Sequence, residues 1–180
     1  MIDDNEILAA FAKIETQNKA FTELVKKYQQ RVYWHIRKMV IEHDDADDIT
    51  QDVFVKIWKN LAHFKNESSL YTWIYRIATN ECLTFLTSKR KKLNTSFEDL
   101  EENLTNKLST SAYISGDEIQ IKLQKAILTL PEKQRLVFNM KYFDDLTYEE
   151  ISEILETTVG GLKASYHIAS KKIEEYMISN

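Results

Sequence analysis

The sequence contains few of the residues that make tight turns or covalent cross-links. Its 180 residues include three Gly, one Pro and one Cys. So little Gly and Pro argues against an all-β fold, which needs many turns. The one cysteine, Cys82, has no partner for a disulfide within the chain, and its apolar neighbours indicate a small core residue. We therefore expect a helical protein of a reducing compartment, the cytoplasm.

The sequence also lacks the signatures of membrane insertion, metal binding and catalysis. No stretch approaches the roughly 18 consecutive apolar residues of a membrane-spanning helix. The first residues, MIDDNEILAAF, are acidic and do not have the order of a signal peptide. The four His residues are scattered, and no glycine-rich phosphate loop or nucleophile–base pair is present. We predict no cofactor, no metal site and no enzymatic activity.

Charge divides the chain into three parts. Residues 1–92 carry a net charge of +2, residues 93–117 of −4 and residues 118–180 of −2. The middle part is polar, acidic and rich in Ser, Thr and Asn, which is typical of a linker. Lys, Glu, Leu and Ile are plentiful on both sides of it, and these residues favour helix. We therefore predict an all-α protein with helical domains at 1–92 and 118–180, joined by an acidic linker at 93–117.

Two helices are predicted upstream of residue 42. Residues 3–16 have the apolar spacing of a short amphipathic helix, and Ala20–Ile41 that of a longer one. The longer helix is expected to bend or break near Gln30.

The stretch from Asp44 to Asn80 is predicted to form a helix, a short loop and a second helix. The first helix is expected to be capped by Asp44 or Asp45. Its apolar residues recur at steps of three and four and predict a buried stripe: Ala46, Ile49, Val53, Ile57 and Leu61. Another face is predicted to be solvated, with Asp48, Gln51, Asp52 and Val55.

The loop after this helix is polar and holds one aromatic residue, Phe64. Ser68 or Ser69 is expected to cap the second helix. A second apolar stripe is predicted from Trp73, Ile74, Ile77, Ala78 and Phe85. The residues expected outside that stripe are Tyr71, Tyr75, Arg76, Thr79 and Asn80. The helix ends in four cations, Lys89–Lys92, which suit either a helix C-terminus or DNA phosphates.

The pattern of the C-terminal part predicts four helices. Glu118–Leu128 is amphipathic, and Pro131 is expected at the first position of the next helix. Thr147 and Glu150 have the spacing of a capping box at the start of a third helix. A last helix is expected to run to about Met177.

The last two helices have the pattern of a helix-turn-helix. One side of the final helix is apolar, with Leu162, Tyr166, Ala169, Ile173 and Met177. Another side carries Lys163, His167 and Lys171, and no acidic residue occurs from Thr157 to Ile173. Such a helix pair places its second helix in the major groove of DNA. The sequence therefore predicts a DNA-binding surface on the final helix.

Two blocks resemble a known family. The pattern D-x-x-D-x-x-Q-x-x-F from Asp45 to Phe54, followed by YTWIYRIATN from Tyr71 to Asn80, resembles region 2 of bacterial RNA polymerase sigma-70 family factors. The block from Leu128 to Ile173 resembles region 4 of the same family. The order and spacing are most similar to the small extracytoplasmic-function, or group 4, sigma factors.

The resemblance implies that the chain binds core RNA polymerase and recognises the −10 and −35 elements of promoter DNA. Polymerase binding is implied for the face formed by Asp48, Gln51, Asp52 and Val55. Recognition and melting of the −10 element are implied for His63, Phe64, Lys65, Asn66, Ser68, Tyr71, Tyr75, Arg76, Asn80, Lys89 and Arg90. Contact with the −35 element is implied for Thr158, Gly160, Gly161, Lys163, Ala164, His167 and Lys171.

The family also implies a further partner, an anti-sigma factor that is membrane-linked in some members. The acidic linker would run along polymerase or act as a solvated tether. The final helix departs from the family pattern, which often has Arg where Ser165, Ile168 and Ser170 stand, and Thr where Gly161 stands. Fewer cations predict weak binding of the free chain to promoter duplex.

Two other function classes stay open on the sequence alone. A helix-turn-helix regulator that binds only duplex DNA would explain residues 146–173 and leave Asp44–Asn80 without a role. A helical adaptor that binds a protein and no DNA would make Lys89–Lys92 and Lys163–Lys171 ordinary solvated faces.

Overall fold

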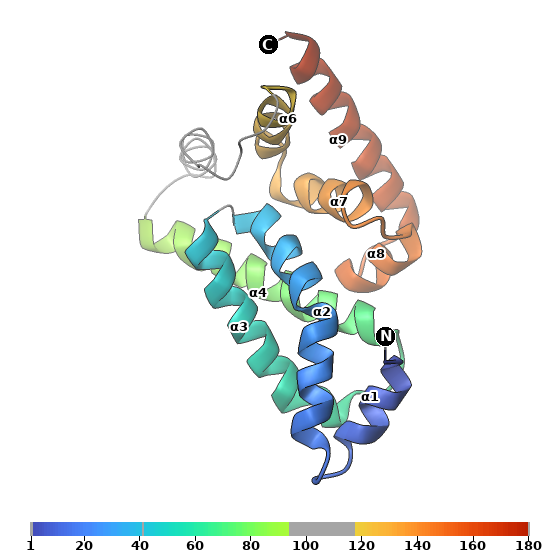
Figure 1. Cartoon of the computed structure of the whole chain (residues 1–180). Coiled ribbons are helices and arrows are strands. Elements are labelled where there is room, and N and C mark those ends of the chain that lie inside the picture. The colour runs from blue at the N-terminus through green and yellow to red at the C-terminus, as the bar shows by residue number, and fades with distance from the viewer. Residues whose placement is uncertain (1, 41, 94–117, 180) are drawn as a thin grey trace. The chain divides into compact units, whose positions relative to one another are not determined.

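The described residues of this computed structural model are 2–40, 42–93 and 118–179, and all of their regular elements are helices (Figure 1). The predicted all-α fold is therefore confirmed for these ranges. The chain divides into two compact units, Met1–Thr84 and Phe85–Asn180, so the division falls within α4 (Leu70–Leu93). Almost all of the predicted linker lies outside the described residues, and the boundaries at 92 and 118 stay a prediction. None of the described helices has the length and apolar character needed to cross a membrane.

In the first unit, α2 packs against α1 on one side and α3 on the other (Figure 1). The elements are α1 (Asp4–Phe11), α2 (Gln17–Val40), α3 (His43–Asn60), the 3₁₀ turn η1 (Leu61–His63) and most of α4. The helix α2 is continuous through Gln30, so the expected break is wrong, while the alternative of a bend stays a prediction. Its buried positions Tyr28 and Val32 lie on either side of Gln30 on one uninterrupted face, so packing supports the helix through that point.

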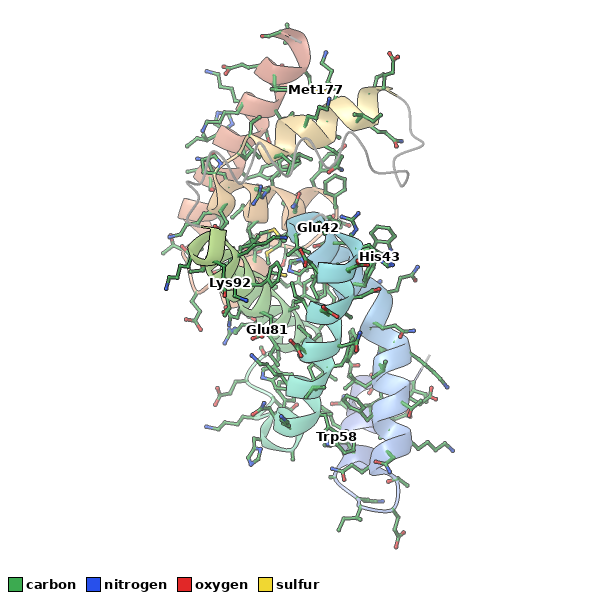
Figure 2. All side chains as sticks on the ribbon, turned by 90° about the vertical axis from the view of Figure 1, so that its left-hand side faces the viewer. Glu42, His43, Trp58, Glu81, Lys92 and Met177 are labelled. Carbon is green, nitrogen blue, oxygen red and sulfur yellow. The ribbon has the colours of Figure 1, made fainter. Side chains whose placement is uncertain are left out.

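Aromatic rings join the three N-terminal helices at one end of the bundle. The ring of Trp58, labelled in Figure 2, lies 4.9 Å from that of Phe21 and 5.3 Å from that of Phe11, both edge-on. Asp4 accepts hydrogen bonds from the Lys27 ammonium and the Tyr28 hydroxyl, each at 2.8 Å. The beginning and end of α1 are thus both attached to the bundle.

The start of α3 differs from the expectation. The helix begins at His43 and its N-cap is Glu42, so Asp44 and Asp45 lie in the first turn and do not cap it. Their carboxylates still lie near the positive end of the helix dipole. The predicted buried stripe is confirmed, since all five of its members are buried: Ala46, Ile49, Val53, Ile57 and Leu61.

The buried face of α4 is rotated relative to the predicted one. Ser69 caps the helix, with its Oγ accepting from the Thr72 amide at 3.0 Å, which confirms one of the two expected caps. Tyr75 and Thr79, which were expected outside the core, are each 1% exposed. The reason is His35 of α2, which is itself buried. Its Nε2 lies 3.0 Å from the Thr79 hydroxyl, and its ring lies 4.8 Å from that of Tyr75.

Three residues of the apolar stripe predicted for α4 lie nearer the surface than expected. Trp73, Ile77 and Phe85 are half-buried, while Ile74 and Ala78 are fully buried as expected. A polar partner on the neighbouring helix thus decided which side of α4 faces the core.

In the second unit, α9 packs against three other helices (Figure 1). The elements are α6 (Glu118–Leu128), α7 (Glu132–Tyr142), α8 (Tyr148–Leu155) and α9 (Val159–Ser179). Their core includes Ala126, Ile127, Leu130, Phe138, Ala169 and Ile173. Pro131 is the N-cap of α7 and not its first residue. Phe143 is the C-cap residue of α7 and is 37% exposed.

The helix-turn-helix pair is delimited by local hydrogen bonds. Thr147 Oγ1 accepts from the Glu150 amide, and the Glu150 carboxylate accepts from the Thr147 amide at 2.8 Å, which confirms the capping box. Glu156 ends α8 in the left-handed conformation, with φ of 51°. Thr158 then caps α9, since its Oγ1 accepts from the Gly161 amide at 3.2 Å.

Candidate polymerase and nucleic-acid interfaces

The outer face of α3 presents acidic, amide and apolar groups together. Asp48, Gln51, Asp52 and Val55 are all exposed, and Val55 keeps 49% of its surface open to solvent. They follow helical spacing on the side away from buried Ile49 and Val53. The predicted solvated face is therefore present. This mixture of groups suits a protein partner better than DNA, because two carboxylates would repel phosphates.

A cleft of about 340 Å³ lies between the end of α3 with η1 and the first half of α4. Its lining residues are Lys56, Asn60, His63, Trp73, Ile77, Asn80 and Glu81. Of these, His63 and Asn80 were predicted as −10 contacts. The other five were not, because the cleft forms between side chains that are up to 25 positions apart in the chain. Helical spacing connects two parts of the set, Lys56 with Asn60 and His63, and Trp73 with Ile77 and Asn80, but it does not connect one part with the other.

Phe64 lies beside this cleft. Its ring is 5.2 Å from that of Trp73, with the two planes tilted by 45°. Phe64 also lines a smaller pocket of about 210 Å³ with Leu8, Phe11, Ala12, Leu61, Ala62 and Asn66. The backbone of Asn66 is in the left-handed conformation, with φ of 56°, which Asn adopts more readily than most residues. The loop therefore changes direction two residues after its aromatic residue.

The remaining predicted −10 residues differ in their exposure to solvent. Lys65 is exposed, and Ser68, Tyr71 and Arg76 are half-buried. The ring of Tyr71 lies 4.3 Å from that of Tyr75, which is the buried member of the pair. The Tyr75 ring is enclosed in this structure and has no face open for stacking on a base, and its assignment to the −10 element stays a prediction.

The basic end of α4 is described only in part. Lys89 is half-buried, and its ammonium lies 5.4 Å from the centre of the Phe85 ring. Lys91 and Lys92 are exposed on the following turn. The side chain of Arg90 lies outside the described part of the chain. The cations and the aromatic ring form a combination that suits nucleic acid as well as a helix terminus.

The predicted −35 residues lie on the exposed surface of α9 and its cap. Thr158, Gly160, Gly161, Lys163, Ala164, His167 and Lys171 are all exposed. A Cβ added to Gly161 would lie 3.2 Å from Thr158 Oγ1, whereas one added to Gly160 would meet nothing within 4 Å. A side chain at position 161 would therefore crowd the capping hydroxyl, whereas position 160 borders open space.

The lysines on or near this surface already have weak partners. The Lys163 ammonium lies 5.7 Å from the centre of the Tyr148 ring, and Lys141 lies 5.4 Å from the same centre. Partial burial, followed by the neighbouring Tyr166, raises the pKa of Tyr148, so its hydroxyl stays neutral beside these cations. Lys171 lies 4.0 Å from Glu175 at the exposed end of the face. An exposed pair at that distance is weak and can exchange for a phosphate.

Among the described residues, no three or more His, Cys, Asp or Glu side chains are grouped closely enough to hold a metal ion.

Comparisons with known proteins identify the family. Residues 24–92 match the model of sigma-70 region 2, and residues 120–173 match that of sigma-70 region 4. The ECF RNA polymerase sigma factor SigW of Bacillus subtilis (strain 168) is 33% identical over 159 residues, which cover 82% of this chain and 83% of SigW.

Two solved structures share the fold. CnrH in complex with the cytosolic domain of CnrY aligns with a TM-score of 0.70 at 19% identity, covering 98% of each chain. The sigma factor RpoE in complex with the anti-sigma factor NepR, from Bartonella quintana, aligns with a TM-score of 0.67 at 20% identity, covering 90% of this chain and 99% of RpoE. The family expected from the sequence is thus confirmed: the chain belongs to the extracytoplasmic-function group of sigma-70 factors, which direct transcription initiation by RNA polymerase.

Proposed function

We propose that this sigma factor divides its work among three surfaces. The α3 face with Asp48 and Gln51 binds core polymerase. The cleft beside Phe64 receives bases of the −10 element, and the exposed side of α9 contacts the −35 element. The observation that carries the proposal is the cleft, where one aromatic wall and several polar side chains meet in a space of about 340 Å³.

The cleft has the chemistry of a site for an unpaired base. Bases in a duplex hide their Watson–Crick edges, so a protein that reads one strand must hold bases after they leave the stack. Trp73 offers an aromatic ring, while Asn60 and Asn80 offer amides that can donate and accept hydrogen bonds. Stacking on an aromatic side chain stabilises a base by roughly 1–3 kcal/mol. Such a site supports melting because it binds only the opened strand.

The α3 face provides the polymerase contact in this scheme. Polymerase supplies the chemistry of RNA synthesis, so the chain acts as a non-catalytic subunit. It does so in the cytoplasm. A face with Val55 at 49% exposure among carboxylates and an amide offers both apolar area and directional contacts. Because α3 also contributes Lys56 and Asn60 to the cleft, one rigid helix connects polymerase binding to strand binding.

The α9 surface contributes a weak duplex contact. It carries Lys163 and Lys171, while Ser165, Ile168 and Ser170 stand where relatives often have Arg. Nonspecific affinity rises with the number of phosphates neutralised, so two or three lysines bind weakly at physiological salt. Polymerase would hold the −10 and −35 contacts at a set separation and convert two weak contacts into one effective site.

We also propose an anti-sigma factor as a partner. RpoE of Bartonella quintana, which shares this fold, was solved with the anti-sigma factor NepR. A protein that covers the α3 face would block polymerase binding directly. Affinity capture from cells before and after stress tests this proposal. Recovery of polymerase and never of a dedicated inhibitor would count against it.

The central experiment is transcription by a reconstituted holoenzyme. Purified core polymerase is mixed with the chain and a library of random promoters, and the transcribed sequences are identified. We expect specific initiation that requires both components, and negligible gel shift of the same promoters by the chain alone. Tight, sequence-specific shifts by the isolated chain at physiological salt would instead favour a simple helix-turn-helix regulator.

A further inference from the structure

An ion pair spans the cleft described above. The Lys56 ammonium on α3 pairs with the Glu81 carboxylate on α4, and both side chains line the cleft with Trp73 and Asn80. The Glu81 side chain is 19% exposed and that of Lys56 is 50% exposed. Glu81, labelled on α4 in Figure 2, is therefore the more enclosed member of the pair.

A carboxylate is an unusual group for a surface that binds DNA strands. Glu81 repels phosphates, and Lys56 compensates its charge, so the pair attracts the backbone little at long range. A carboxylate does have one use against nucleic acid, which is to accept hydrogen bonds from the edge of a base. Glu81 lies one residue after Asn80 on α4, the helix that also provides the aromatic ring of Trp73.

We infer that Glu81 makes the cleft select a base with an exocyclic amino group, so that thymine is rejected. This inference rests on the proposed role of the cleft in binding the opened −10 strand. Cytosine, adenine and guanine each carry an amino group that donates to a carboxylate. Thymine carries none, and its one ring N–H lies between two carbonyl oxygens that repel a negative charge.

Lys56 has a supporting role in this selection. Its ammonium holds the Glu81 carboxylate in one place, which lowers the conformational entropy lost when a base binds. Its remaining protons can donate to a ring nitrogen or carbonyl oxygen on the same base edge. One charged donor and one charged acceptor side by side complement an edge that carries both an amino group and an acceptor.

The test compares the wild-type holoenzyme with Glu81→Gln, since glutamine keeps the size of the side chain and both donates and accepts. Each factor selects promoters from the same random library, and each −10 position of the non-template strand is then changed to all four bases. We expect one position at which the wild type disfavours thymine by about tenfold in open-complex formation, since one good base contact is worth that much. With Glu81→Gln, thymine should be accepted there almost as well as the other bases. The matched control is Glu23→Gln, which breaks a different surface ion pair, with Lys26, outside the cleft and should keep the wild-type preference.

The outcomes separate this inference from the proposed function. If wild-type holoenzyme does not open promoters at all, the proposed function fails. If it opens them with no position that disfavours thymine, the inference is wrong. The inference is also wrong if Glu81→Gln keeps the preference and only lowers the melting temperature, because the ion pair then only stabilises the packing of α3 against α4. The base substitutions need only the wild-type chain, so they can overturn the inference even if Glu81→Gln folds poorly.

Discussion

The ring of Phe64 lies 5.2 Å from that of Trp73, joining the loop after η1 to the first turns of α4. Trp73 was expected in the core, yet it is half-buried and lines the open cleft. A pair of tilted rings at this distance stabilises the loop beyond the area it buries. The loop is thus held in place before any strand binds, although its own residues form no regular helix.

Removal of the loop aromatic should therefore affect DNA opening more than polymerase binding. We expect Phe64→Ala to reduce open-complex formation by about tenfold, since the ring contact that positions the loop against Trp73 contributes about 0.5–1.5 kcal/mol beyond the area it buries. Affinity for core polymerase should stay unchanged. Potassium permanganate footprinting and a titration with labelled core measure the two effects. The control, Ile14→Ala, removes a side chain that is 92% exposed in the turn before α2. Equal loss of both activities would indicate misfolding instead.

An added positive charge on the outer face of α3 should weaken polymerase binding directly. Asp48→Arg or Gln51→Arg is expected to weaken core binding at least tenfold, because a long cation disrupts a complementary interface. The thermal midpoint should change little, since both side chains are exposed. A fluorescence titration with core polymerase and circular dichroism test the two statements. Asn18→Arg, on an exposed position of α2, is the control. Unchanged core affinity in both α3 variants would remove this face from the polymerase interface.

Loss of one cation on α9 should appear in the salt dependence of promoter binding. We expect Lys163→Ala to lower the slope of log affinity against log salt by about one unit in the holoenzyme. The effect should be similar for different promoter sequences, because a phosphate contact carries no base information. Lys13→Ala, at an exposed position in the first unit, should keep the wild-type slope. A slope that does not change would place Lys163 on its Tyr148 ring in the complex as well.

The capping box of α8 should contribute measurably to stability. Thr147→Ala removes the acceptor for the Glu150 amide and is expected to cost about 1 kcal/mol of unfolding free energy. Urea unfolding followed by circular dichroism measures this loss. Thr157→Ala, three residues before Gly160 at another exposed threonine, should change stability by less than half as much, because its side chain caps no helix in the described structure. Equal effects of the two variants would contradict the energetic importance of the box.

Cys82 should resist thiol reagents in the folded chain. Burial, followed by the charge of Glu81, raises the pKa of the Cys82 thiol well above its usual value, and the side chain is fully enclosed. The thiolate is the reactive form, so we expect Ellman's reagent at pH 8 to label the native chain far more slowly than the urea-unfolded chain. The same shift makes unfolding easier as pH rises above the ordinary thiol pKa, since only the unfolded thiol then ionises. Rapid labelling under native conditions would show that α4 opens locally.

Local patterns in the sequence predicted much of the architecture. The stripe from Ala46 to Leu61 is buried as its spacing required, because a helix with one apolar face gains most by turning that face inward. The capping box at Thr147 and the cap at Ser69 were also predictable, since a cap depends on two to four neighbouring residues. The family resemblance then predicted which regions bind polymerase and DNA.

The sequence alone was sufficient to identify the family, because two motif blocks occur in the family's order. It was also sufficient to predict the helices and their strongest apolar faces, because these depend on contacts within a few residues. Tertiary packing decided the details of the site. Tyr75 and Tyr71 both looked like outer-face residues, yet buried His35 on α2 draws Tyr75 and Thr79 inward and leaves Trp73 at the cleft. The pairing of Lys56 with Glu81 joins residues 25 positions apart. Helical spacing says nothing about which neighbouring helix a side chain will meet, so only the packed structure brings these two charges into one cleft.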